Sequence, residues 1–433
     1  MVIIGGGLAG LSTAYHLEQQ GFTNYRIFEK DSRAGGLCKS LVIDDFTFDY
    51  ATHILYSGDS YAEELIKNKL LNNEFDSQIR KSFVFYRGIY TEYPFQAHLY
   101  GQDPDIIQEC ILGLIKATYG GASNPRNFEE WIYSTFGSGI AEHFMLPYNR
   151  KQWAIDLSRM SYDWVAKRVP IPKIEDVLEG ALKPPQRKYG PNAYFWYPLR
   201  GGMGALPDGF LPYIRNISLN SEISKISLPA KEVEVKGERL KYDKLVSTIP
   251  LPQTISLIAD DVPTEVKQAA ESLEYNAVYA INLAVDRPNI SSYHWVYFPE
   301  TKSIFHRIGF PMNLSPFMAP EGESSITAEI SVSKHKPLKM GQDEIIEAVI
   351  AGLLECGVIK KGDGILFRDF RRLDPAYVTY TPNRRENVEL VHSFLNSNDI
   401  YPCGRFGDWE YSNMDQSILS GQKVAQAVTK NMT

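Results

Sequence analysis

A short apolar segment leads directly into a glycine-rich turn at the start of this 433-residue chain. Residues 2–4 predict a buried strand. Gly5, Gly7 and Gly10 follow it with the spacing G-x-G-x-x-G, where a helix is expected to begin. Such glycines permit a tight turn, a close approach by a pyrophosphate and close packing of the helix on the sheet, while Glu29 ends the next predicted strand and can accept hydrogen bonds from a ribose. Together these features predict a dinucleotide-binding βαβ unit; a glycine-rich turn without a ligand is the alternative.

A second glycine pair follows Glu29 at once, at residues 35–36. Its position resembles that in FAD-binding proteins of the amine oxidase and protoporphyrinogen oxidase group, whereas NAD dehydrogenases usually lack such a pair. An ordinary loop is the alternative. The residues expected to hold the cofactor in this part of the chain are Gly5, Gly7, Leu8, Ala9, Gly10, Glu29, Lys30, Gly35, Gly36 and Leu37.

Composition limits the partners and the compartment. The formal net charge of −7 argues against nucleic acid as the main partner. This charge does not exclude a local basic pocket for a ligand that carries phosphate. The cysteines are scattered without metal-ligand spacing, which favours a reduced, cytoplasmic setting and no bound metal. No stretch approaches the roughly 18 apolar residues that span a bilayer, and no signal peptide is expected. Composition leaves the oligomeric state open.

The order of predicted elements indicates a discontinuous first domain. Apolar residues at helical spacing over 106–115 begin a helical section, strand-like runs follow it, and the runs at 244–250 and 400–407 are expected to return to the first strand. We therefore predict an α/β fold: an FAD-binding Rossmann-like domain with an inserted helical domain and an antiparallel β-sheet domain. The expected ranges are 1–80 with 200–250 and 395–433, then 100–190, and 81–99 with 251–394. In the FAD-binding proteins that the chain resembles, a C-terminal strand, glycine turn and helix lie against the flavin and its ribityl chain, which implies this position for Arg405, Asp415, Gln416 and Ser417.

Five blocks resemble the eukaryotic type of UDP-galactopyranose mutase. They read YPFQ at 93–96, FMLPYNRKQWA at 144–154, GPNA at 190–193, YPLRGG at 197–202 and GRFGDWEY at 404–411. The resemblance implies an isomerase that interconverts pyranose and furanose forms of a UDP-hexose, with UDP-galactose and its galactofuranose product expected. It implies reduced FAD, a covalent adduct between flavin N5 and the sugar, and no net redox change. A reduced nicotinamide, NADH or NADPH, is expected to recharge the flavin.

The same resemblance implies the residues of the site. Arg168 and Arg307 are expected to bind the diphosphate, because a planar guanidinium binds phosphate oxygens in pairs and stays charged. His53 is implied to lie beside the flavin, where its protonation state would tune the ring. The remaining implied substrate residues are Tyr93, Gln96, Asn149, Trp153, Asn192, Trp295, Tyr297, Tyr377 and Tyr411. Surface salt bridges for the arginines, core packing for the aromatic residues and a carbonyl-bonded buried histidine are the alternatives.

Within that set the resemblance distinguishes two ends of the substrate. Tyr377 and Tyr411 match tyrosines that hydrogen-bond the diphosphate. Tyr93 and Gln96 match the uridine end, where an aromatic face can stack on the base. Asn149, Trp153 and Asn192 match residues that line the pocket of the sugar and nucleotide.

Two positions depart from the family pattern, and two rival functions stay open. Residues 51–52 are Ala-Thr where the family usually has a glycine pair, and Leu314 stands where it usually has a tyrosine. These departures leave the exact sugar undecided. A redox flavoenzyme of the amine oxidase, desaturase or protoporphyrinogen oxidase type explains the N-terminal glycines equally well, but not the arginines and tyrosines that suit a diphosphate. A non-catalytic flavoprotein is the second rival.

Overall fold

Five parallel strands form a sheet that brings both ends of the chain together. In the computed structural model, which describes residues 1–121, 124–165, 168–184 and 186–430, the strand order is β19-β13-β1-β2-β9. All neighbouring pairs of this sheet are parallel. The strands are β1 (Val2–Ile4), β2 (Arg26–Phe28), β9 (Ile217–Ser218), β13 (Leu245–Ser247) and β19 (Ile400–Pro402). The two late apolar runs therefore return to the first strand, as the sequence indicated.

Alternate residues of β1 enter two different apolar cores. Ile3 packs in the core beneath α1 (Leu8–Gln19) and α13 (Met414–Lys430), whereas Val2 and Ile4 pack against the helices on the opposite face. Those helices are α8 (Leu251–Ser256), α9 (Thr264–Glu271) and α11 (Arg384–Ser397). Successive side chains of a strand point to opposite faces, so a sheet covered on both sides needs apolar residues throughout. This explains the unbroken Val-Ile-Ile of the strand.

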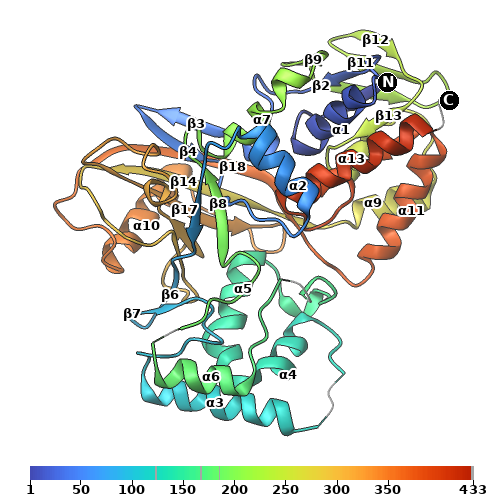
Figure 1. Ribbon diagram of the computed structural model, residues 1–433. Coiled ribbons are helices and arrows are strands. Elements are labelled where there is room, and N and C mark those ends of the chain that lie inside the picture. The colour runs from blue at the N-terminus through green and yellow to red at the C-terminus, as the bar shows by residue number, and fades with distance from the viewer. Residues whose placement is uncertain (122–123, 166–167, 185, 431–433) are drawn as a thin grey trace.

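Helices α1 and α13 lie side by side next to both termini (Figure 1). A Cβ atom on Gly421 of α13 would come within 2.6 Å of the carbonyl oxygen of Ala9 on α1. A side chain at that position would separate the helices, so glycine lets the last helix pack directly on the first. The C-terminal segment is thereby held beside the glycine-rich turn.

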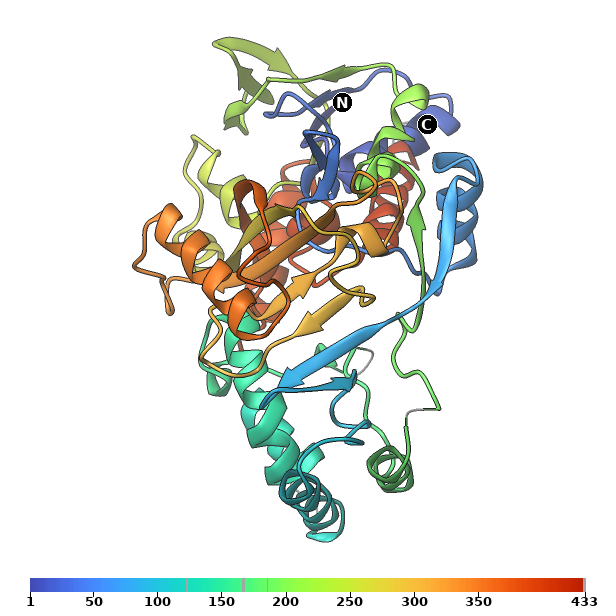
Figure 2. The same cartoon turned by 90° about the vertical axis from the view of Figure 1, so that its left-hand side faces the viewer.

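A seven-stranded sheet, mostly antiparallel, forms the second layer of the molecule. Its order is β18-β14-β17-β16-β15-β6-β7, and its one parallel pair is β15 with β6. The strands are β6 (Ser82–Tyr86), β7 (Ile89–Glu92), β14 (Tyr275–Val285), β15 (Trp295–Tyr297), β16 (Arg307–Gly309), β17 (Ser324–Val332) and β18 (Ile365–Val378). Helix α10 (Gln342–Glu355), orange at the left of Figure 2, packs its apolar face on this sheet. On the other face of the sheet, Val278 of β14 and Leu373 of β18 pack against Ala51.

The helical insert lies at the end of the molecule away from the parallel sheet (Figure 1). Its helices are α3 (Pro104–Tyr119), α4 (Phe128–Ile140), α5 (Leu146–Trp153) and α6 (Ile174–Leu182). Glycines let α3 and α4 touch through their backbones: a Cβ atom on Gly113 would lie 2.8 Å from the amide nitrogen of Gly139. Helix α5 continues this unit up to the seven-stranded sheet, and so carries residues of the insert toward the centre of the chain.

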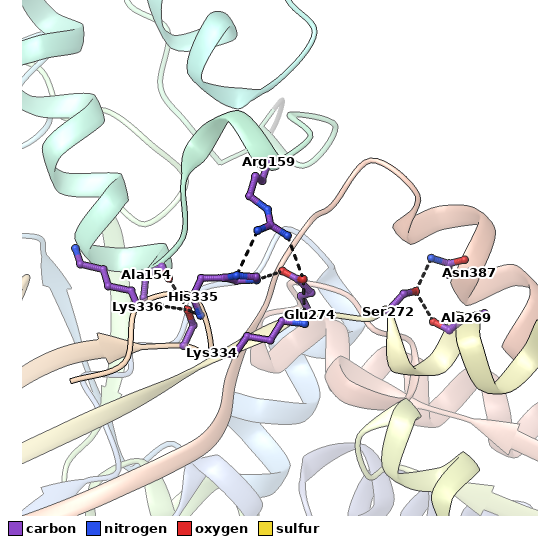
Figure 3. A network of polar contacts seen from close by, with 10 residues as sticks. Ala154, Arg159, Ala269, Ser272, Glu274, Lys334, His335, Lys336 and Asn387 are labelled. Carbon is purple, nitrogen blue, oxygen red and sulfur yellow. Dashed lines mark hydrogen bonds and ion pairs between the residues drawn. The ribbon is translucent and has the colours of Figure 1, made fainter. Parts of the chain in front are cut away.

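A polar network fastens the insert to the sheet, as Figure 3 shows. Glu274 lies just before β14. Its carboxylate oxygens lie 2.8 Å from Nε2 of His335 and 3.0 Å from Nζ of Lys334. Arg159, which follows α5, approaches the ring of His335 at 3.3 Å. The charged groups of three segments distant in sequence thus meet at one carboxylate, which fixes the end of α5 relative to the sheet.

The observed architecture confirms the predicted fold class. It combines a parallel α/β unit, an inserted group of helices and a separate antiparallel sheet. The remaining elements are α2 (Ser60–Glu64), α7 (Ala205–Asp208), α12 (Gly404–Gly407), β3 (Ser40–Ile43), β4 (Phe46–Asp49), β5 (Phe75–Ile79), β8 (Tyr194–Pro198), β10 (Ile223–Ser227), β11 (Glu232–Val235) and β12 (Glu238–Lys241). Among the described residues, no helix combines the length and the apolar character needed to cross a bilayer.

Candidate functional site

A cavity of about 610 Å³ lies where the carboxyl ends of the parallel strands face the seven-stranded sheet. Crevices at this edge of a parallel sheet are the usual ligand sites of α/β folds. Its walls come from β1 and β2, from β16 and β18, and from the segment before α13. Many of the sequence-predicted residues line it: Gly5, Gly7, Leu8, Ala9, Glu29, Lys30, Gly35, Gly36, Leu37, His53, Arg307, Tyr377, Arg405, Tyr411 and Ser417.

The glycine-rich turn presents an uncapped helix end to this cavity. Gly7 precedes α1 without a side-chain cap, and the first turn of the helix contains no acidic residue. The free N–H groups and the partial positive charge of such an end favour an anion. Gly10 does not line the cavity; a Cβ atom there would collide with the carbonyl oxygen of Gly5, so its role is close packing, as predicted. The amide of Gly35 donates to Gly6 at 2.8 Å and brings the second glycine pair against the first.

Glu29 is buried at the end of β2 and is held in a fixed orientation. Its two carboxylate oxygens accept hydrogen bonds from the amides of Gly6 at 2.7 Å and Asp31 at 2.9 Å. A carboxylate has about four acceptor sites, so each oxygen keeps capacity for another donor. A fixed acid, an uncapped helix end and a glycine-lined approach together fit a dinucleotide with its ribose at Glu29 and its pyrophosphate at α1.

His53 lines the cavity with a neutral imidazole. Its Nδ1 lies 2.8 Å from the carbonyl oxygen of Ala51, which can only accept, so this nitrogen carries the hydrogen. Burial lowers the pKa of His53 below its ordinary value, and the nearby Asp49 only partly opposes this effect. Nε2 is then left as an acceptor. His53 is therefore bonded to a carbonyl, as one interpretation of the sequence had it, and it also lines the cavity, as the other required.

Arg307 of β16 lines the cavity and forms an ion pair with Glu329 of β17. Nε and Nη2 of the guanidinium donate to the two carboxylate oxygens at 3.0 and 2.6 Å. Nη1 makes no hydrogen bond to a described residue. The surface salt bridge considered from the sequence is wrong for this arginine, because the side chain of Glu329 is 0% exposed. Sequence reasoning missed Glu329, although it is the one carboxylate in a strand of otherwise uncharged residues.

Arg168 does not line the cavity itself but lies on Tyr411, which does. Its guanidinium carbon sits 4.1 Å from the centre of the Tyr411 ring, and Nη2 donates to the backbone oxygen of that residue. Nη1 and Nη2 also lie 3.3 Å from the side-chain oxygens of Asn413 and Gln416. Among the described residues, no carboxylate pairs with it, so its positive charge is held by neutral acceptors. Gln416, which was expected beside the flavin, accepts a hydrogen bond from Arg168 in this structure.

Tyrosines surround the cationic part of the cavity. The rings of Tyr377 and Tyr411 are 5.5 Å apart, and Trp153 of the insert packs edge-on to both. Arg405 lies over the same two rings at 5.0 and 5.1 Å and donates to backbone oxygens on either side. Burial raises the pKa of Tyr377 to about 12, so its hydroxyl keeps its proton and can donate to an anion.

A second cluster continues from this wall toward the insert. Tyr297 lies opposite Arg307 in the strand register, and its ring is 4.8 Å from that of Tyr93. Arg80, which the sequence analysis did not select, lies 4.9 Å from the centre of the Tyr93 ring and donates to Asn192. Arg80 is 2% exposed and has no ion pair with a described residue. Tyr93, Tyr297 and Asn192, three residues that the resemblance implied, therefore meet around Arg80, beyond the main cavity.

Several predicted side chains have local partners. Asn149 donates to Met145 at 2.7 Å and accepts from the indole of Trp153 at 3.2 Å, so its amide stabilises α5. Gln96 donates to Pro170 at 3.1 Å, while its buried Oε1 lacks a described partner. Asp415 accepts from Ser57 at 2.9 Å and keeps its other oxygen without one. Trp295 is buried beside the rings of Phe195 and His294 and does not line the cavity.

The two departures from the family pattern have different surroundings. Ala51 and Thr52 line the cavity, and a Cβ atom on Gly309 would collide with the Thr52 hydroxyl, so Gly309 makes room for the threonine. Leu314 is 2% exposed and packs in the main apolar core. Its backbone oxygen accepts from Gln78 at 2.7 Å. The described part of the chain contains no group of three potential metal ligands.

Comparisons with known proteins agree with this geometry. Residues 8–429 match the family of flavin-containing amine oxidoreductases. The chain belongs to this family. The flavin cofactor of the family supports FAD as the dinucleotide that fits the cavity.

Individual relatives differ in their activities. The crystal structure of a reduced UDP-galactopyranose mutase matches with a TM-score of 0.93 and 29% identity, covering 99% of this chain and 93% of that one. A candidate protoporphyrinogen oxidase from Exiguobacterium sp. 255-15 matches with a TM-score of 0.76 and 17% identity, covering 99% and 98%, and shows the shared fold. A 4,4'-diapophytoene desaturase from Staphylococcus aureus is 23% identical over 61% of this chain, and the match spans 58% of its own length.

Replacing Glu29 by glutamine should weaken FAD binding by roughly 10- to 100-fold, because a hydrogen bond to a charged group contributes about 1.5–3 kcal/mol. Fluorescence titration of flavin-free protein with FAD measures the effect. Glu63→Gln, which removes a carboxylate paired with Lys67 outside the cavity, is the matched control. Equal FAD affinity in the Glu29 and Glu63 variants would remove Glu29 from the cofactor site.

Proposed function

We propose that this chain is a flavin-dependent mutase that interconverts the pyranose and furanose forms of a UDP-hexose, with UDP-galactose as the expected substrate. The observation that carries the proposal is the cationic, tyrosine-lined wall formed by Arg307, Arg405, Tyr377 and Tyr411, with Arg168 behind Tyr411. Reduced FAD, when bound, supplies the electron pair that holds the sugar while its ring opens and recloses.

The protein's own part in this reaction is to bind and orient a diphosphate leaving group. Fixed guanidinium and hydroxyl donors stabilise a developing phosphate charge without reorganising during the step. Arg307 lines the cavity from a side chain fixed by Glu329, with no described residue bonded to its Nη1, and Tyr377 contributes a protonated hydroxyl. The departing UDP must stay close, because the same diphosphate returns to the rearranged sugar. A site with several donors meets both requirements.

The second cluster supports a nucleotide that extends from the diphosphate. Tyr93 and Tyr297 present adjoining rings between Arg80 and Arg307, so a base and a ribose can extend along them. Stacking on an aromatic face suits any base, and the amide of Gln96 offers an oxygen that has no described partner. The proposal therefore places the sugar at the cavity, the diphosphate at the arginines and uridine at Tyr93.

The structural comparison supports the mutase over the redox rivals. The likeness to a UDP-galactopyranose mutase extends over 99% of the chain, whereas the desaturase match covers 61% of it. An apolar substrate such as a carotenoid offers no acceptor for Nη1 of Arg307 or for the hydroxyl of Tyr377, whereas a diphosphate does. The proposal includes a reduced nicotinamide as the source of electrons and the cytoplasm as the location.

The experiment is to incubate dithionite-reduced protein with a panel of UDP-hexopyranoses and to separate the products by chromatography. We expect the furanose form of at least one UDP-hexose, with UDP-galactose first. GDP- and dTDP-sugars serve as controls for the base. If every nucleotide-sugar is left unchanged while an amine or a porphyrinogen is oxidised, the redox reading replaces this one.

A further inference from the structure

Glu329 is a buried carboxylate at the centre of the seven-stranded sheet. It is 0% exposed and lies in the middle of β17, opposite Arg307 of β16 on one side and Ala280 of β14 on the other. Isolated buried charges are costly, and a buried ion pair often contributes no more stability than apolar residues of the same size. Stability alone is therefore a weak reason for a carboxylate at this position.

The carboxylate joins two separate parts of the cavity wall. It accepts both hydrogen bonds from Arg307, and its Oε1 also accepts from the backbone amide of Thr52 at 3.1 Å. Thr52 directly precedes His53, and both line the cavity. One side chain thus fixes the guanidinium assigned to the diphosphate relative to the segment beside the flavin.

The imidazole beside Glu329 does not neutralise its carboxylate. The ring of His306 lies 3.9 Å from the carboxylate, but burial lowers the pKa of His306 to about 3, so the imidazole is neutral. Burial would raise the pKa of Glu329, while the Arg307 guanidinium lowers it below its ordinary value. The pair is therefore charged on both sides at neutral pH, with a net charge near zero.

We infer that Glu329 is a positioning residue of the proposed mutase, which sets the direction of Arg307 and the place of residues 51–53 so that diphosphate and anomeric carbon are presented together. This inference rests on the proposed function. A carboxylate next to Arg307 reduces the attraction of that arginine for phosphate, so it does not serve affinity. Glu329 contributes geometry, because a planar guanidinium that is hydrogen-bonded at two nitrogens is held in one orientation.

A second two-point pair in the same protein provides the matched control. Arg287 donates to Asp363 through Nε at 2.8 Å and Nη2 at 2.9 Å. Neither residue lines the cavity. Asp363→Asn therefore breaks the same kind of interaction without touching the proposed site, and shows what the loss of such a pair does to the fold alone.

The experiment compares FAD-loaded Glu329→Gln, Glu329→Asp and Asp363→Asn with the parent protein. The readouts are bound FAD, melting temperature, the Kd of UDP, and kcat and KM for UDP-galactopyranose with reduced enzyme. Glu329→Gln should lower kcat by roughly 10- to 100-fold, as a small misplacement of a binding group does. Its Kd for UDP should be no weaker than that of the parent, because Arg307 loses its counter-charge. Glu329→Asp should lower kcat without tightening UDP, and Asp363→Asn should change neither.

Each result decides one question. A Glu329→Gln enzyme with bound FAD and unchanged kcat would overturn the positioning role, as would equal losses of kcat and UDP affinity, which a general structural defect produces. If Glu329→Gln loses FAD, the comparison of Glu329→Asp with Asp363→Asn decides by the same measurements. Failure of the parent protein to convert any UDP-hexopyranose would instead contradict the proposed function.

Discussion

Replacing Arg307 by alanine should reduce turnover of a UDP-hexopyranose by roughly 1,000-fold while FAD stays bound. The change removes a fixed cationic donor from the wall assigned to the diphosphate, and single preorganised donors are commonly worth about 100- to 1,000-fold in rate. None of the residues that contact the glycine-rich turn is altered. Steady-state kinetics with reduced enzyme measures the loss, and visible absorbance measures the flavin content.

The same variant should also be less stable, because Glu329 would remain buried without its partner. Breaking a buried ion pair from one side typically costs about 3–5 kcal/mol. Arg307→Ala combined with Glu329→Gln removes the stranded charge, so it should recover most of the stability but none of the turnover. Full turnover in the single variant, or loss of FAD from the double variant, would mean that Arg307 acts elsewhere than on the diphosphate.

The stability deficit of Arg307→Ala should depend on pH. In the parent protein the pKa of Glu329 is lowered by Arg307 against the effect of burial, so the pair stabilises the fold at neutral pH and this contribution is lost as the pH falls through that pKa. Without Arg307 the largest effect that lowers the pKa of Glu329 is gone, so burial raises that pKa and acid then protonates the carboxylate and removes its buried charge. The melting temperatures of variant and parent should therefore converge as the pH is lowered.

Gly10→Ala should yield protein without bound flavin. Its new Cβ atom would collide with the carbonyl oxygen of Gly5, in the turn that leads into α1. Because backbone on both sides is packed, the collision can be relieved only by moving the helix end away from the cavity. Visible absorbance of the purified protein and its melting temperature report the two effects.

Gly58→Ala is the matched control for that substitution. A Cβ atom at Gly58 meets nothing within 4 Å, and its backbone needs no left-handed conformation. This variant should retain the parent's flavin content. A Gly10→Ala protein that is equally yellow would show that the helix end does not bind the cofactor as we describe.

The nucleotide-binding part of the fold was predictable because its constraints are local. Gly5, Gly7 and Gly10 belong to one turn and the start of α1, close together in sequence, and Glu29 directly follows the next strand. The returning strands were recognisable as apolar runs, since a sheet covered on both faces requires them. The insert likewise showed helical spacing before its contacts were known.

The residues that complete the site could not be found in this way. Glu329 meets Arg307 through the register of two strands, and it meets Thr52 across 277 residues of sequence. Arg80 reaches Asn192 through the pairing of segments 112 residues apart. No local pattern specifies such pairings. The resemblance implied Asn149 as a substrate residue, and the structure shows its amide bonded to Met145 just before α5 and to Trp153 at its end.

Counting electrons during turnover tests most directly whether this enzyme is a mutase. Protein reduced with dithionite under anaerobic conditions is mixed with a large excess of UDP-galactopyranose, and both the flavin spectrum and the furanose product are followed. We expect many equivalents of UDP-galactofuranose per flavin while the spectrum stays that of the reduced form. Reoxidation of the flavin with at most one equivalent of product, or no furanose at all, would contradict this expectation.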